Sequence, residues 1–79
     1  MRDISSEIEM CEQRLRELGR YERAEELAAA VRGGATGTEV VLTVRAILRD
    51  VRRHERGLPR DLKRLMRRVI WEVDKTFGL

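Results

Sequence analysis

The sequence contains only one cysteine, Cys11, and only one histidine, His54. A single cysteine cannot form a disulfide within the chain, and these two residues are too few for a metal site of ordinary ligand number. The 79 residues leave room for one domain, 1–79, which we expect to be marginally stable on its own. Self-association is then the remaining way to supplement a small core.

Long apolar runs are absent as well. No apolar stretch approaches the roughly 18 residues that a membrane span needs, and the start of the chain lacks the basic and then apolar pattern of a signal peptide. We therefore expect a soluble, cytoplasmic protein with no membrane partner. Arginine outnumbers lysine by fifteen to two. Because a GC-rich genome gives the same bias, we interpret the composition as bacterial.

Residues that carry enzyme chemistry are scarce. Cys11 falls within an apolar stripe, which favours a small buried side chain over a reactive thiol. No Ser, Cys, Asp or Glu stands at a spacing from His54 that would make a catalytic dyad, so His54 is predicted to be a partly solvated surface residue. The glycine-rich stretch 33–39 precedes a helix, as phosphate loops do, but it lacks a Gly-Lys-Ser/Thr ending. We expect a protein that is not an enzyme and uses no metal and no cofactor.

Apolar residues recur at spacings of three and four through four segments, which predicts helices near 4–18, 21–31, 39–56 and 59–77. Their apolar positions are Ile4, Ile8, Cys11, Leu15 and Leu18, then Tyr21, Ala24, Leu27, Ala28 and Val31, then Val40, Val41, Val44, Ile47, Leu48 and Val51, and finally Leu62, Leu65, Met66, Val69, Ile70, Val73 and Phe77. The short connections favour antiparallel neighbours. We predict an all-α fold, a small helical bundle of two consecutive helical hairpins with three to four helices, completed by dimerisation. The first hairpin is expected near 4–32 and the second near 37–77.

The turn of the first hairpin is expected at Gly19, since the apolar stripe before it does not continue in phase after it. The segment from Leu15 to Val31 resembles the turn between the two helices of a tetratricopeptide repeat, through Leu18, Gly19, Arg20, Tyr21, Ala24 and Ala28. This resemblance covers one hairpin, and a shift of about 34 residues finds no second repeat, so it implies nothing about function. A continuous helix bent at Gly19 is the alternative.

Local signals mark the starts of three helices. Thr36 followed by Glu39 predicts a capping box, and the first helix is capped either by Ser6 with Glu9 or, one turn earlier, by Asp3. Pro59 is expected in the first turn of the last helix, where its missing N–H group has no intrahelical partner to lose.

Charge is distributed unevenly along the chain. Residues 1–40 contain six basic and nine acidic residues, and residues 41–79 contain eleven basic and five acidic ones. The first part therefore carries a formal charge of −3 and the second +6, within a net charge of +3. Such asymmetry is typical either of a nucleic-acid surface or of two parts, or two subunits, that attract each other. We predict that the acidic first hairpin packs on the basic second one.

Trp71 is the main functional clue, because its helical phase places it opposite the apolar face of the last helix. We predict that it forms a protein interface, most simply a homodimer contact, with Arg64, Arg67 and Lys75. The alternative is that the first hairpin of the same chain covers it. Further contacts to phosphate or to an acidic partner are predicted at Arg45, Arg49, Arg52, Arg53 and Arg56. The expected function is a non-enzymatic, homodimeric accessory or regulatory interaction module, and the alternative is weak nucleic-acid binding by the arginine-rich second half.

Overall fold

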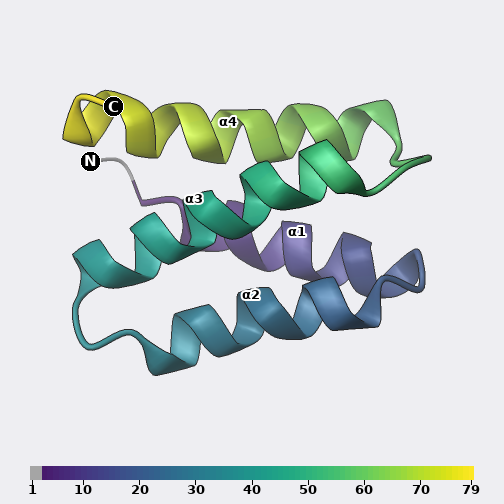
Figure 1. Ribbon diagram of the computed structural model, residues 1–79, viewed down its shortest axis with the longest axis horizontal. Helices are drawn as coiled ribbons and strands as arrows, with labels where there is room; N and C mark the ends of the chain where they lie inside the picture. Colours follow the sequence, from purple (N-terminus) through teal and green to yellow (C-terminus); the bar gives the residue numbers. More distant parts are fainter. Residues whose placement is uncertain (1–2) are drawn as a thin grey trace.

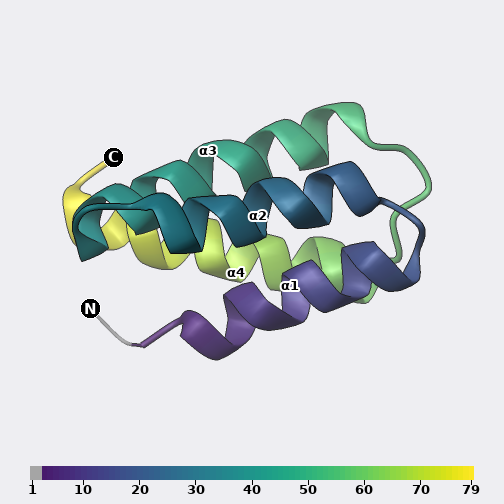
Figure 2. The ribbon, with the colours of Figure 1, turned by 90° about the horizontal axis from the view of Figure 1, so that it is seen from below.

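A computed structural model describes residues 3–79 as four α-helices joined by short connections. The helices are α1 (Ser5–Glu17), α2 (Tyr21–Gly33), α3 (Gly37–His54) and α4 (Arg60–Phe77). Consecutive helices run antiparallel and pack against each other, and α1 also packs against α4, which closes the bundle (Figure 1, Figure 2). The predicted all-α bundle of two helical hairpins is confirmed. None of the helices between residues 3 and 79 is long and apolar enough to cross a membrane.

The core runs along the centre of the bundle and receives side chains from all four helices. Each helix turns the middle of its predicted apolar stripe inward, as the spacing of three and four requires. In this closed ring of four helices each helix packs against two neighbours, which cover most of its apolar stripe. The largest fully buried side chains are Cys11, Leu15, Leu27, Val44, Leu48, Val51, Leu62, Met66, Val69 and Val73.

Four residues that were expected on these stripes are exposed instead, namely Leu18, Tyr21, Val31 and Phe77. Leu18 follows the last residue of α1, and Tyr21 is the first residue of α2, so both lie at the end of the bundle. Phe77 is the last residue of α4 and lies one turn beyond Val73, which is fully buried. The spacing of apolar residues predicts which way a side chain points. It does not predict whether a neighbouring helix extends far enough to cover that side chain.

Gly19 forms a turn, which makes the continuous bent helix wrong. Its φ of 78° lies in the left-handed region that glycine adopts without steric cost. The N–H of Arg20 donates to the carbonyl of Leu15 at 2.8 Å, and that of Gly19 donates to the carbonyl of Arg16 at 3.1 Å. These two bonds form a Schellman motif, which ends α1 and reverses the chain into α2.

The predicted caps are present with small differences. Thr36 Oγ1 accepts from the N–H of Glu39 at 3.1 Å, while the Glu39 carboxylate accepts from the N–H of Ala35 at 3.1 Å rather than from that of Thr36. At α1, Asp3 is the side chain that accepts a backbone N–H, from Ser5 at 2.9 Å. This bond lowers the pKa of Asp3. The earlier of the two expected starts is therefore correct, but Ile4 takes the N-cap position and Asp3 lies one residue before it.

The last two helices are each shifted slightly from their expected limits. Helix α3 begins at Gly37 and ends at His54, two residues earlier than expected at both ends. Helix α4 begins at Arg60, so that Pro59 takes the N-cap position just outside the first turn. Arg56 consequently lies in the connection between the two helices and not on α3.

Candidate functional site

Trp71 lies on the outer side of α4 and is 57% exposed. The ammonium group of Lys75, one turn later, lies 4.4 Å from the centroid of the indole ring in a cation–π contact. Lys75 also lies 3.6 Å from the carboxylate of Glu72. The first hairpin does not cover the ring, so that alternative is wrong. A large aromatic side chain is left at the surface with a cation beside it.

Trp71 belongs to a row of residues that runs along α4 beside α3. Arg60, Lys63, Arg67, Trp71 and Asp74 follow one another at spacings of three and four, which places them on one side of the helix. At the end of this row Asp74 forms an ion pair with Arg45 of α3. That contact identifies the row as the one that flanks α3.

A matching row runs along α3. Arg45, Arg49 and Arg52 are spaced by four and three, so they share one side of the helix. Since Arg45 contacts α4, this side flanks α4. We call the surface formed by the two rows the basic face, and its members are Arg45, Arg49, Arg52, Arg60, Lys63, Arg67 and Trp71. Arg53 and Arg64 are exposed next to it.

The carboxylates of residues 41–79 are neutralised within the molecule. Arg23 of α2 has a central part, because its guanidinium lies 2.9 Å from Asp50 and 3.1 Å from Glu55. Arg20 lies 3.2 Å from the other oxygen of Glu55. Each of the remaining three also has a basic partner. The pairs are Asp61 with Arg14, Glu72 with Lys75, and Asp74 with Arg45.

Two of these contacts favour the ionised form of the carboxylate. The hydrogen bond from Arg14 lowers the pKa of Asp61, and the hydrogen bond from Arg23 lowers the pKa of Asp50. A carboxylate that already has a cation as its neighbour offers little repulsion to an approaching anion. The acidic residues interspersed in the basic half therefore weaken its positive surface less than their number suggests.

The first hairpin packs on the second, as predicted, through contacts of α2 with α3 and of α1 with α4. The ion pairs between the hairpins join arginines of the first to carboxylates of the second, as in Arg14 with Asp61 and Arg23 with Asp50. The packing thus neutralises the less common charge of each hairpin, which is positive in the first and negative in the second. The more common charge, negative in the first hairpin and positive in the second, is left at the surface. We call these the minority and the majority charge of each hairpin.

Nine basic side chains make no ion pair with any other described residue. Eight of them are exposed, and the ninth, Arg52, is half-buried with its Nε lacking a hydrogen-bond partner. All nine fall between the middle of α3 and the middle of α4, so their positive charges are concentrated around the connection between these two helices. They are Arg49, Arg52, Arg53, Arg56, Arg60, Lys63, Arg64, Arg67 and Arg68.

The candidate residues from the sequence thus divide into three groups. Arg49, Arg52 and Arg67 lie on the basic face without an ion pair, and Arg67 shares its side of α4 with Trp71. Arg45 lies there too, but it is half-buried and forms an ion pair with Asp74. Arg56 is exposed in the connection after α3, so it does not extend the row along that helix.

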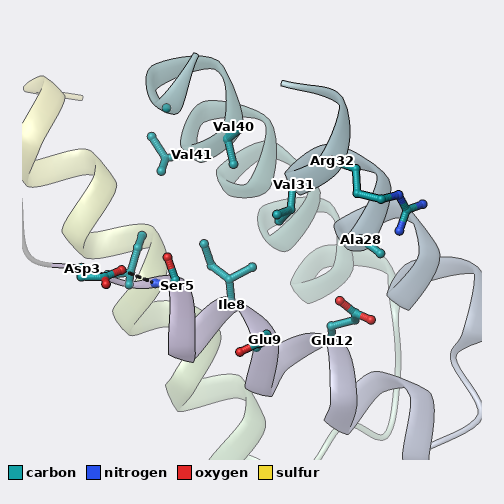
Figure 3. Close-up of a pocket in the computed structure, with 12 residues that line it drawn as sticks. Asp3, Ser5, Ile8, Glu9, Glu12, Ala28, Val31, Arg32, Val40 and Val41 are labelled. Atoms are coloured by element: carbon teal, nitrogen blue, oxygen red, sulfur yellow. Dashed lines mark hydrogen bonds between the residues drawn. The ribbon is translucent and has the colours of Figure 1, made fainter. Parts of the chain in front are cut away.

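A second surface feature was not predicted from the sequence. A groove of about 710 Å³ lies between the first turns of α1 and the last turns of α2, with the start of α3 below it. Its apolar lining is Ile4, Ile8, Ala28, Val31, Val40 and Val41, and its polar rim includes Asp3, Glu9, Glu12 and Arg32 (Figure 3). We call this the α1–α2 groove.

Val31 explains why the groove is there. It has the inward phase of Ala24 and Leu27 on α2, yet it is 48% exposed because α1 and α2 are separated at this end. Ile8 of α1, Val31 of α2 and Val40 of α3 point toward the opening (Figure 3). The apolar stripe of α2 is therefore incompletely covered in the single chain. The exposed Val31 could have been suspected only from the separation of two helices, which sequence spacing does not encode.

The residues considered for enzyme chemistry have structural surroundings. Cys11 is fully buried, and burial raises the pKa of its thiol to about 12. His54 is exposed, and its Nδ1 lies 3.0 Å from the Asp50 carboxylate one turn earlier, which corrects the expectation that no Asp stands at a spacing from His54 suited to a dyad. Within residues 3–79 no group of His, Cys, Asp and Glu is placed to hold a metal ion.

Comparison with protein-family models, with curated proteins and with solved structures finds no match to this chain. Its function must therefore be argued from the basic face and the α1–α2 groove.

Proposed function

We propose that this protein is a non-enzymatic interaction module that self-associates through its basic face, with Trp71 as the central contact. The observation that carries the proposal is the exposed indole ring of Trp71, which follows the cations Arg60, Lys63 and Arg67 along one side of α4. Tryptophan and arginine are the residues most enriched where interfaces derive their affinity. A lone tryptophan on a polar helix side has no role in the core of its own chain.

The contribution of Trp71 to such an interface follows from its exposed area. A tryptophan that is 57% exposed leaves about 100 Å² of mainly apolar surface in water, from a total of about 150–250 Å². At about 25 cal/mol per Å², covering it contributes about 2.5 kcal/mol. This corresponds to a change of roughly 50- to 100-fold in a dissociation constant.

Sedimentation equilibrium from micromolar to millimolar protein tests the proposal. We expect the average mass to rise with concentration, and Trp71→Ala to raise the dissociation constant by the amount above while the monomer stays folded. Tyr21→Ala is the matched control, since it removes an exposed aromatic ring at the start of α2, outside the basic face. A wild-type chain that stays monomeric up to 1 mM would contradict self-association.

Nucleic-acid binding is the second candidate, and one observation favours it. The carboxylates of the basic half are held by cations, which leaves nine basic side chains to face phosphates. Binding of this kind weakens as salt is added. The slope of the logarithm of the binding constant against the logarithm of the salt concentration falls in magnitude by about one for each phosphate contact removed.

Titration of a labelled DNA duplex at several salt concentrations tests this candidate. We expect weak binding with a steep salt dependence, reduced by Arg67→Ala and unchanged by Arg16→Ala, which alters an ion-paired arginine of α1. Nanomolar affinity at physiological salt would reverse the order of the two candidates.

A further inference from the structure

The α1–α2 groove and the basic face lie on opposite sides of the bundle. The groove opens between α1 and α2, while the basic face flanks the contact of α3 with α4. In a closed ring of four helices these are opposite pairs of neighbours (Figure 1, Figure 2). Trp71 therefore cannot reach the groove of its own chain, and a contact between the two features must join two molecules.

The two features are complementary in shape and polarity. A groove of about 710 Å³ falls within the range of roughly 300–1,000 Å³ that accommodates ring-sized ligands. Its floor is aliphatic, and the exposed Val31 and the half-buried Val40 are the surfaces on which an indole ring would lose contact with water. Trp71 is the largest exposed apolar side chain of the molecule.

Charge is complementary as well. The rim of the groove carries Asp3, Glu9 and Glu12 against a single arginine, Arg32, and of these carboxylates Glu12 already pairs with Arg16. Glu9 is exposed and has no ion pair with another described residue. Trp71 is flanked by cations of the basic face. Because the ion pairs within the chain neutralise the minority charge of each hairpin, these opposite majority charges remain available to a neighbouring molecule.

We propose that Trp71 of one molecule inserts into the α1–α2 groove of a second copy, so that the α3–α4 side of each molecule binds the α1–α2 side of the next. This inference rests on the proposed self-association and names the surface that receives Trp71. An interface of about 800 Å² on each partner would cover roughly a sixth of the 5143 Å² surface, which is comparable to one side of a four-sided bundle.

This arrangement is heterologous, because the two partners contribute different surfaces. Each molecule in a pair retains one unused Trp71 and one unused groove, so association continues beyond a dimer unless a ring closes. The contact also joins opposite charges at the surface and is therefore weakened by salt. The heterologous contact therefore predicts an average molecular mass that grows beyond the dimer and falls in high salt. A two-fold contact between two Trp71 residues predicts a mass that stops at the dimer.

The decisive experiment mixes two variants that each lack one half of the contact. Trp71→Ala retains an intact groove, and Val31→Arg fills the groove with a cation while changing a residue that is already half-exposed. Each variant alone is expected to be monomeric at a concentration where the wild type associates. Their equimolar mixture is expected to give a 1:1 heterodimer that does not grow further, seen by sedimentation velocity.

Glu9→Arg gives a second test that leaves the apolar residues unchanged. It replaces the first test if circular dichroism shows that Val31→Arg is unfolded. Reversing this exposed rim charge should raise the dissociation constant at least tenfold. Glu22→Arg is the matched control, because it makes the same charge reversal on an exposed residue near the other end of the bundle, and it should change the constant less than threefold.

The outcomes separate the two proposals. If Trp71→Ala weakens association while Val31→Arg and Glu9→Arg do not, and the mixture forms no heterodimer, self-association stands and the groove is not its receptor. If the wild type remains monomeric up to 1 mM, both proposals are overturned and the groove serves a different occupant, such as a small apolar ligand.

Discussion

Replacing Leu48 by alanine is expected to lower the free energy of unfolding by about 3 kcal/mol. Leu48 lies near the middle of α3 and is 0% exposed. Removing three buried carbon atoms loses about 2.4 kcal/mol at roughly 0.8 kcal/mol per methylene, and the remaining cavity brings such changes to about 2–5 kcal/mol. A chain of 79 residues has a total stability of about 4–12 kcal/mol, so this one change removes a large share of it.

Urea unfolding followed by circular dichroism measures this difference as a shift of the midpoint at constant slope. Leu42→Ala is the matched control, because it makes the same chemical change on the same helix at a residue that is 36% exposed. We expect it to cost less than about 1 kcal/mol. If Leu48→Ala changed stability by less than half a kcal/mol, or if both variants cost the same, the inward face of α3 would be assigned wrongly.

Three further predictions concern a charge, a turn and a thiol. The hydrogen bond from Arg14 lowers the pKa of Asp61 below 3.8, so the pair stabilises the fold above that pH and loses this contribution as pH falls through the folded pKa. Asp61→Asn should therefore destabilise the protein at pH 7 and much less at pH 2, by urea unfolding at both. Gly19→Ala should cost about 1–2 kcal/mol because φ is 78°, whereas Gly33→Ala, at an unobstructed helical position, should be neutral or stabilising. Cys11 should resist an aromatic disulfide reagent at pH 8 until urea unfolds the chain, because burial raises its pKa to about 12.

The helices and their connections could be predicted because they depend on neighbours in sequence. The 4, 3, 4 spacing of Ile4, Ile8, Cys11 and Leu15 gave the buried side of α1, and all four are buried. The loss of phase after Leu18 located the turn at Gly19. Trp71 was placed at the surface by the same argument, since a residue opposite a broad apolar face has no core to enter.

The partners of the charged residues could not be predicted in this way. Arg23 pairs with Glu55, which is 32 positions away, and Arg14 pairs with Asp61, which is 47 positions away. Which of several arginines meets a given carboxylate depends on the rotation and height of two packed helices. The α1–α2 groove was missed for a related reason. The sequence gives the inward direction of Val31, but only the separation of α1 and α2 leaves it exposed.

In each ion pair between the hairpins the first hairpin supplies the arginine and the second the carboxylate. This determines which of the charges counted in the sequence remain at the surface. If acidic residues of the first hairpin had paired with the arginines of the second, packing would have neutralised most of both majority charges and left the minority charge of each hairpin unpaired. Arg14, Arg20 and Arg23 instead pair with carboxylates of the second hairpin. The excess of negative charge on α1 and α2 and the excess of positive charge on α3 and α4 consequently both remain at the surface. The net charge of +3 therefore understates the electrostatic field on each side of the bundle, and an anionic partner is attracted to one side only.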